Sequence, residues 1–212
     1  MIVEGKGPLN TPVTLLCDED GRLYVEGQIA LESLPAGTNS IGAVSSNSVV
    51  QSATITRPAD TTAYAAKDVV STLAGAVIEF TGMARANAGT GTIVRARLMT
   101  SQKTNVALYR LHLFHTAPTA IADNSPYLLL YANAANRIGS IDFPALSTED
   151  PTNSTSAAGM RPSYDGSYNA PNLWYKCKSD GTSLYGILET LSAFTPDSAQ
   201  TFFIELGADG LS

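Results

Sequence analysis

The sequence predicts an all-β protein: an antiparallel β-sandwich of jelly-roll type, preceded by an extended N-terminal arm that carries a hairpin. Short alternating or β-branched runs recur from residue 49 to the C-terminus, with glycine, proline, asparagine and serine between them. Such spacing of strands and turns is typical of sandwiches and jelly rolls. We find neither a convincing amphipathic helix nor a repeat of fixed period, which argues against propellers and solenoids.

The clearest alternation lies between residues 89 and 118. In residues 94–98, Val94 and two further apolar residues share one face of a strand, and two arginines share the other. In residues 109–113, apolar residues alternate with an arginine and a histidine. Successive side chains of a strand point to opposite faces, so both runs are expected to be half-buried strands. The polar residues 101–105 between them predict a β-hairpin at the centre of the sheet.

The remaining elements follow from the same signals. Further strands are predicted over residues 49–56, 68–70, 74–85, 136–143 and 200–206. A second hairpin is predicted over residues 173–191, around Asp180-Gly181. Residues 127–131 are wholly apolar, which suits a buried strand as well as a helical turn. Residues 144–171 contain four prolines and predict a long surface loop, either contacting a partner or simply solvated.

Residues 1–40 differ from the rest of the chain. Short apolar runs flank Asp20-Gly21, a pair typical of hairpin turns, and glycines and prolines isolate this hairpin on both sides. A lone hairpin is marginally stable in water. We therefore expect residues 1–40 to form an arm that attaches to a neighbouring protein, and residues 41–212 to form the sandwich. The residues expected to bind the partner are Val13, Leu15, Leu16, Leu23, Tyr24 and Val25.

Composition narrows the class of protein. Charged residues make up 15% of the 212 residues, against about 25% in an average protein. The net charge of -6 and the scattered basic residues argue against nucleic-acid binding, which needs clustered lysine and arginine. We expect no membrane span, because no apolar stretch approaches the roughly 20 residues required. The N-terminus lacks the layout of a signal peptide, so we expect cytoplasmic synthesis, with Cys17 and Cys177 as reduced thiols.

The sequence offers no candidate metal or cofactor site. His112 and His115 are the only histidines, and three-residue spacing in a strand places them on opposite faces, where they cannot chelate one ion. Residues 18–20 are acidic but lack the later ligands of a calcium loop. Gly89-Thr90-Gly91 lacks the third glycine of a dinucleotide-binding loop. We therefore expect no cofactor.

The sequence contains only weak signals for catalysis or for sugar binding. No nucleophile elbow is found, and nothing in the local sequence marks Cys17 as an activated thiol. A glycosidase needs only two carboxylates, so a pair drawn from Glu79, Asp142 and Glu205 stays open, although nothing selects these three beyond their place in predicted strands. Trp174 is a core aromatic or, alternatively, a platform on which a sugar stacks.

One segment resembles a known group of proteins. Residues 55–70, with the sequence ITRPADTTAYAAKDVV, resemble a segment that recurs in small structural proteins of tailed bacteriophages. Residues 9–21 are similar to the N-terminal peptides by which such proteins attach to virions. The resemblance implies a head decoration, head-fibre or tail protein without an enzymatic role, and it carries over no catalytic residues.

The expected function is therefore non-enzymatic. We expect a virion protein made in the host cytoplasm, most simply a capsid decoration or cementing protein that binds the major capsid protein or another virion protein. The resemblance, together with uncharged outward positions at Thr54, Thr56, Thr81 and Thr92, favours a homotrimer. The alternatives are a tail or fibre adaptor, a carbohydrate- or receptor-binding module that uses Trp174, Tyr175 and the 144–171 loop, and finally a β-sandwich glycosidase.

Overall fold

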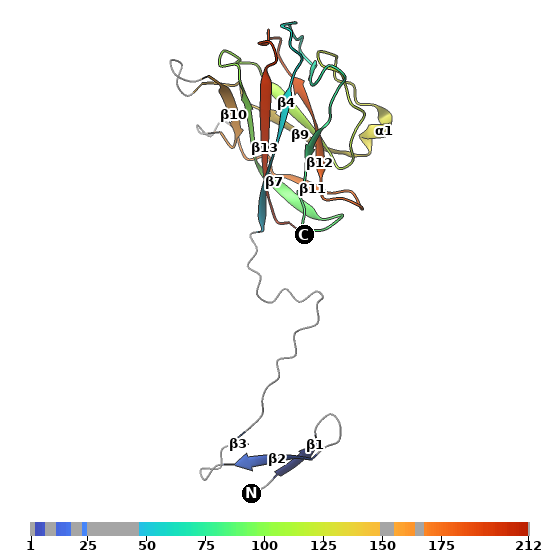
Figure 1. Ribbon diagram of the computed structural model, residues 1–212, viewed down its shortest axis with the longest axis vertical. Coiled ribbons are helices and arrows are strands. Elements are labelled where there is room, and N and C mark those ends of the chain that lie inside the picture. The colour runs from blue at the N-terminus through green and yellow to red at the C-terminus, as the bar shows by residue number, and fades with distance from the viewer. Residues whose placement is uncertain are drawn as a thin grey trace. The chain divides into compact units, whose positions relative to one another are not determined.

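The computed structural model describes residues 3–6, 12–17, 23–24, 47–148, 155–163 and 168–211. The chain divides into two compact units, residues Met1–Val44 and Ser45–Ser212. The first contains a small sheet and the second a β-sandwich, in which α1 (Tyr131–Ala134) is the only helix among the described residues (Figure 1). No helix in these residues is long and apolar enough to cross a membrane.

The first unit contains a three-stranded antiparallel sheet of β1 (Val3–Lys6), β2 (Pro12–Cys17) and β3 (Leu23–Tyr24), in the order β1-β2-β3. The predicted hairpin corresponds to β2 and β3. Strand β1, which pairs along β2, was not predicted from the sequence. The hairpin is therefore part of a three-stranded sheet, in which β2 pairs with both neighbours.

The second unit is built from two antiparallel sheets packed together, which confirms the predicted all-β sandwich. The first sheet has the order β10-β7-β13-β4, with β11 also paired to β7. Its strands are β4 (Ser48–Thr56), β7 (Thr90–Thr100), β10 (Ala157–Arg161), β11 (Leu173–Lys176) and β13 (Thr201–Asp209).

The second sheet has the order β5-β12-β8-β9, with β6 also paired to β12. Its strands are β5 (Val69–Val70), β6 (Ile78–Phe80), β8 (Tyr109–Phe114), β9 (Arg137–Phe143) and β12 (Leu184–Thr190). The jelly-roll part of the fold prediction stays a prediction.

Alternation of side chains creates the core between the sheets. In β13, Phe202, Ile204 and Leu206 point inward and are buried, and in β8 Leu111 and Leu113 do the same from the opposite sheet. Burying each such side chain stabilises the fold by about 1.5–3 kcal/mol. The two sheets are therefore held face to face by the residues whose period of two predicted the strands.

Both predicted hairpins of this unit are wrong. The strands β7 and β8 exist, but β7 lies in the first sheet and β8 in the second. Similarly, β11 pairs with β7 whereas β12 pairs with β8. A strand with one apolar face can bury that face whether the next strand in sequence lies in the same sheet or in the opposite sheet. Alternation therefore identifies a strand but does not identify the strand with which it pairs.

Three local expectations also need correction. Val94 was expected inside, but β7 bulges there: Gly207 pairs with Arg95 and Ala208 with Ile93, which leaves Val94 as the extra residue. A bulge resets the alternation, and Ala96 returns to the core. The expected 144–171 loop contains β10, and in the apolar 127–131 run only Tyr131 enters a regular element, α1.

Candidate functional site

The small sheet of the first unit carries the residues predicted to bind a partner. Val13, Leu15 and Leu16 lie in β2, Leu23 and Tyr24 lie in β3, and Val25 lies outside the described residues. Leu16 pairs with Tyr24, and Cys17 pairs with Leu23. The role of the predicted residues in binding stays a prediction.

Arg57 is the centre of a buried polar cluster where β4 ends. The residue is only 2% exposed. Its Nε donates to the hydroxyl of Tyr64 at 3.1 Å, and its Nη2 donates to carboxylate oxygens of Asp60 at 2.9 Å and Asp123 at 3.4 Å. Its Nη1 donates to the backbone carbonyls of Asp60 and Asp197. One guanidinium therefore holds three segments that are far apart in sequence. We call this group the Arg57 cluster.

Tyr64 and Asp123 complete the Arg57 cluster. The Tyr64 hydroxyl donates to Oδ1 of Asp123 at 2.5 Å, and the same oxygen accepts the backbone N–H of Ser71 at 2.9 Å. Burial, with the Asp123 carboxylate, raises the pKa of Tyr64, which keeps the phenol protonated as a donor. The Tyr64 ring stacks on Phe194 at a centroid distance of 4.8 Å. The hydroxyl of this tyrosine thus links Arg57 at the end of β4 to the loop that contains Asp123.

Removing the guanidinium should destabilise the sandwich strongly. We expect Arg57→Met to lower the free energy of unfolding by about 3–5 kcal/mol, because it leaves the buried Asp123 carboxylate without its charged partner. The matched control is Arg95→Met, which breaks an exposed ion pair with Glu205 and should cost about 1 kcal/mol or less. Urea unfolding of both variants tests this, and equal losses would contradict the structural role of the Arg57 cluster.

A second buried polar group lies on β8 and β12. His112 Nε2 is 2.7 Å from Glu189 Oε2, and both residues are buried. Nη2 of Arg137 lies 3.2 Å from Nδ1 of His112. Because arginine only donates, Nδ1 is the acceptor, and the ring proton therefore lies on Nε2 and is donated to Glu189. The ring of Tyr127 stacks on the imidazole at 3.9 Å.

This arrangement favours neutral His112. Burial lowers the pKa of His112, although the hydrogen bond to Glu189 acts in the opposite direction. A second proton would also have to occupy Nδ1, which already accepts from Arg137. The unfolded chain, with a histidine pKa of about 6.5, therefore binds a proton at a higher pH than the folded chain does. The stabilising contribution of His112 is complete above that value and is lost as the pH falls below it.

We expect the free energy of unfolding to fall as the pH is lowered from about 7 to 5, with a slope of at most about 1.4 kcal/mol per pH unit from this residue. His112→Gln should remove most of that slope. His115→Gln, which changes the histidine just after β8, should preserve it. Urea titrations at several pH values provide the measurement, and an unchanged slope in His112→Gln would show that other groups cause it.

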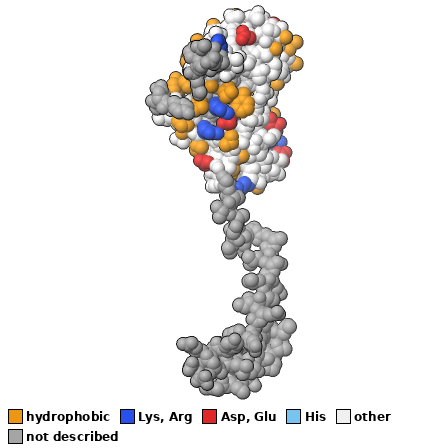
Figure 2. All heavy atoms as spheres, turned by 60° about the vertical axis from the view of Figure 1, so that its left-hand side comes forward, with side chains coloured by type: hydrophobic (Ala, Val, Ile, Leu, Met, Phe, Trp, Pro, Cys, Tyr) orange, Lys and Arg blue, Asp and Glu red, His pale blue; other side chains and the backbone are white. Residues whose placement is uncertain are grey.

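The outer face of the first sheet is an exposed surface of mixed character. Glu205 on β13 pairs with Arg95 at 2.8 Å and Arg97 at 3.1 Å, both from β7. The Arg97 guanidinium lies over the Phe203 ring, 5.5 Å from its centroid. Figure 2, which turns the β10 side of the sandwich forward, shows hydrophobic side chains around basic and acidic ones. Aromatic and arginine side chains together are typical of the centres of protein interfaces.

Trp174 projects from the sandwich. It is 61% exposed, whereas Tyr175 and Cys177 are buried. The expectation of a core tryptophan is wrong because β11 alternates in the opposite phase, and the Tyr175 hydroxyl donates to the backbone carbonyl of Met83 inside. Of the two predicted roles of Trp174, only the exposed platform agrees with this position.

The carboxylates considered for glycosidase chemistry do not come together. Glu205 is on β13 in the first sheet, whereas Asp142 is on β9 and Glu79 on β6, at opposite edges of the second sheet. Asp142 accepts two bonds from Arg110, at 2.6 and 2.8 Å. This contact lowers the pKa of Asp142, the reverse of what a general acid requires. These three residues form no carboxylate pair.

Comparison with known proteins gives no assignment. No family model matches the chain, and no curated protein matches it. Among the described residues, no group of three or more histidine, cysteine, aspartate or glutamate side chains is arranged to hold a metal ion. The Arg57 cluster and the His112–Glu189 pair were missed from the sequence, because a buried charge becomes visible only when its partners from distant segments are placed.

Proposed function

We propose that this chain is a non-enzymatic structural protein of a tailed-bacteriophage virion: a capsid decoration protein that binds the assembled head as a homotrimer. Residues of the first unit attach it to the major capsid protein or to another virion protein. The protein is made in the host cytoplasm and resides in the virion. A tail or fibre adaptor of the same build is the alternative position in the particle.

The observation that carries this proposal is the role of the phage-like segment, residues 55–70. Its polar residues Arg57, Asp60 and Tyr64 are engaged in the Arg57 cluster, and the Asp68 carboxylate accepts the backbone N–H of Ala65 at 2.6 Å. The residues that carry the resemblance therefore maintain the architecture. A resemblance in architectural residues supports a shared scaffold, which is what a family of structural proteins has in common.

The edge of the first sheet supports assembly into a larger structure. The edge strand β4 is nine residues long and contains no charged residue or proline. Natural proteins usually protect such edges with charges, prolines or bulges. The outward residues Thr54 and Thr56 are exposed and uncharged, so a neighbouring subunit can approach without burying an unpaired charge. Binding many such subunits raises particle stability by mass action.

The decisive experiment uses particles that contain the protein. We expect a cryo-EM map of the source virion to show the sandwich on the head at three-fold positions. Particles stripped of the protein should rebind the full chain and should not rebind residues 45–212, although the shorter chain keeps its melting temperature. The described core residues of the sandwich all lie within 45–212, which is the reason to expect independent folding.

Each outcome of this experiment is informative. Density on the tail would favour the adaptor, and monomers on the particle would overturn the trimer. Unfolding of residues 45–212, followed by circular dichroism, would show that residues 1–44 belong to the core. Full rebinding by the shorter chain would remove the attachment role of the first unit.

One observation favours a second candidate function, a carbohydrate- or receptor-binding module. Trp174 is exposed on β11 beside Thr92 of β7, its direct cross-strand partner. A flat, exposed aromatic ring on a sheet is a surface on which a sugar ring can stack. Solvent-exposed tryptophan also dominates many protein interfaces.

Substituting this tryptophan separates the two candidates. Because Trp174 is 61% exposed, we expect Trp174→Ala to change the free energy of unfolding by less than about 1 kcal/mol, far below the 3–5 kcal/mol of a core aromatic. Differential scanning fluorimetry measures this, and Val50→Ala, another exposed strand residue, is the control. Glycan-array binding that disappears in Trp174→Ala alone would favour the module.

A further inference from the structure

Strand β4 is an open edge of the first sheet. It pairs with β13 in one unbroken register, from Ser48 opposite Asp209 to Thr56 opposite Thr201. Among the described residues, no other strand pairs with it. The strand contains neither a proline nor a charged residue, and its register has no bulge. It therefore lacks the devices with which natural proteins usually protect such an edge.

Two backbone hydrogen bonds at the ends of β4 show which of its groups face the edge. The Gly210 N–H donates to the Asn47 carbonyl at 2.9 Å, and the Arg57 N–H donates to the Gln200 carbonyl at 3.1 Å. Both bonds keep the register of β4 with β13. In an antiparallel ladder, hydrogen-bonded positions alternate with positions that bond on the other side, so the odd-numbered residues bond to β13. The even-numbered residues that turn their backbone N–H and C=O groups to the open edge include Val50, Ser52, Thr54 and Thr56.

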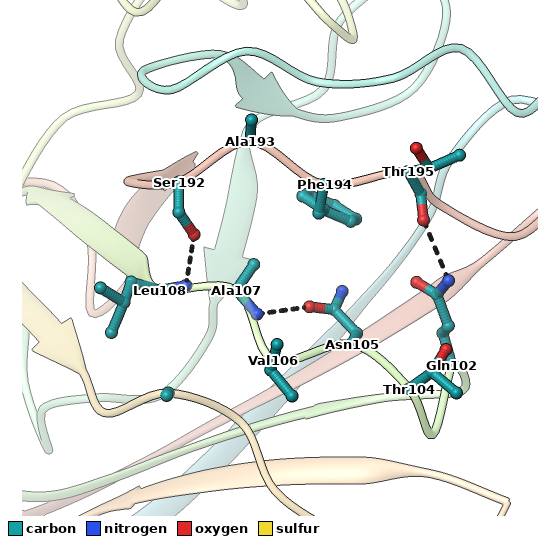
Figure 3. A pocket seen from close by; sticks show the side chains of 11 residues that line it. Gln102, Thr104, Asn105, Val106, Ala107, Leu108, Ser192, Ala193, Phe194 and Thr195 are labelled. Carbon is teal, nitrogen blue, oxygen red and sulfur yellow. Dashed lines mark hydrogen bonds between the residues drawn. The ribbon is translucent and has the colours of Figure 1, made fainter.

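This edge differs from the pocket drawn in Figure 3, where polar groups bond across the opening. There the Ser192 hydroxyl accepts the Leu108 N–H at 3.0 Å. Nε2 of Gln102 donates to the Thr195 carbonyl, also at 3.0 Å. Along β4, in contrast, no described residue bonds to the edge-facing backbone groups of residues 50–56. An added strand would supply their partners, which is a common mode of recognition at sheet edges.

The side chains of β4 are anchored on one face and bare on the other. Val49 and Ala53 pack against the core between the sheets, and Ile55 is buried. Val50 is 54% exposed, and the other even-numbered residues of the strand are exposed serines and threonines. β-Branched and hydroxyl side chains that face each other stabilise a pair of strands. The bare face of β4 thus suits a neighbour of the same composition.

We propose that the edge binds a second copy of itself: two β4 strands pair antiparallel about a two-fold axis at Ser52. Ser52 is the central residue of Ser48–Thr56, so this register pairs the strands over their full length. It places Ser52 opposite Ser52 of the partner subunit and Val50 opposite Thr54 of the partner subunit. The edge-facing positions then meet as hydrogen-bonded pairs, and the first sheets of two copies join into one continuous sheet.

The symmetric register brings no like charges into contact. Glu205 lies opposite Ser52 on β13, and it is already paired with Arg95 and Arg97. Three strand spacings separate this position from its symmetry mate, roughly 14 Å, which exceeds the Debye length of about 8 Å in physiological salt. A chain of net charge -6 therefore meets itself along an uncharged strand. Self-pairing also covers both open edges at once, since a two-fold interface uses the same surface of each copy.

The predicted dimer is weak and does not depend on the virion. A strand of nine residues spans roughly 30 Å, and a single pair of edge strands lies at the small end of specific interfaces. A two-fold contact joins two copies and does not close a trimer. The dimer is therefore additional to the proposed trimer, and it should form in solution without any capsid protein.

Sedimentation equilibrium of the full chain, at concentrations up to about 1 mM, measures the dimer. We expect Ser52→Lys to weaken dimerisation about 10-fold or more, because it places two lysines side by side at the axis. Ser52→Glu should act in the same way. An equimolar mixture of these two variants should restore the dimer, since opposite charges then meet. Leu73→Lys is the matched control, because Leu73 is 78% exposed and lies outside both sheets.

Two further pairs of variants test the register. Val50→Lys mixed with Thr54→Glu should also associate, because these positions face each other. Thr56→Lys mixed with Thr56→Glu should gain nothing over either variant alone, since the two Thr56 residues lie roughly 27 Å apart in this register. Melting temperatures equal to that of the unchanged chain would show that a lost dimer is a local effect.

Three outcomes would overturn the self-pairing. The first is an unchanged chain that forms no dimer over the whole concentration range, and the second is Ser52→Lys that dimerises as well as the unchanged chain. The third is a loss that the mixture of Ser52 variants does not restore, which would place a different segment on the edge. None of these outcomes bears on attachment to the virion, because the experiment contains no particle.

Discussion

The architecture of the sandwich depends on a buried charge. A guanidinium that is almost fully removed from water is costly unless each donor finds an acceptor. Arg57 meets that requirement with carboxylates, a phenol and backbone carbonyls from segments that are distant in sequence. Because those acceptors belong to loops, the charge fixes the loop end of the two sheets in a way that apolar packing alone does not.

Aromatic side chains connect the Arg57 cluster to the core of the sandwich. Tyr64 connects the guanidinium to Phe194, and Phe194 meets Tyr109, whose edge-on contact with Phe202 lies in the core between the sheets. The polar Arg57 cluster and the hydrophobic core are therefore joined by a continuous series of aromatic contacts. The surface residues Arg95, Arg97 and Trp174 lie outside this series, so they are available for binding at little cost in stability.

The sequence predicted strands much better than it predicted neighbours. Residues 49–56, 136–143 and 200–206 were recognised because their alternation or β-branched composition reflects a real buried face. The sheet to which each strand belongs depends on long-range pairing, which leaves no local signal, and both sandwich hairpins failed for that reason. The prediction for Val94 failed because a bulge adds one residue to β7 and reverses inside and outside there. The choice between the two roles of Trp174 depended on which side chains of β11 face the core, and the sequence left that open.

The sequence predicted the candidate functional residues less well than it predicted the fold. The arm residues could be proposed from an isolated turn signal, whereas the Arg57 cluster joins a guanidinium to partners from distant loops. Similarly, His112 looked like an outward strand residue, and its burial against Tyr127 depends on a loop whose course the sequence does not reveal.

The pairing of β10 and β11 with the same edge of β7 has an engineering consequence. Arg161 ends β10 opposite Ala96, and Leu173 begins β11 opposite Ile93, so the chain leaves and rejoins the sheet within three residues of β7, roughly 10 Å. Closing a longer loop between two anchored ends costs little, about 0.6 kcal/mol for each doubling of its length. The connection between these strands is thus a suitable insertion point for an epitope or a small reporter domain, with the ladder on either side acting as its clamp.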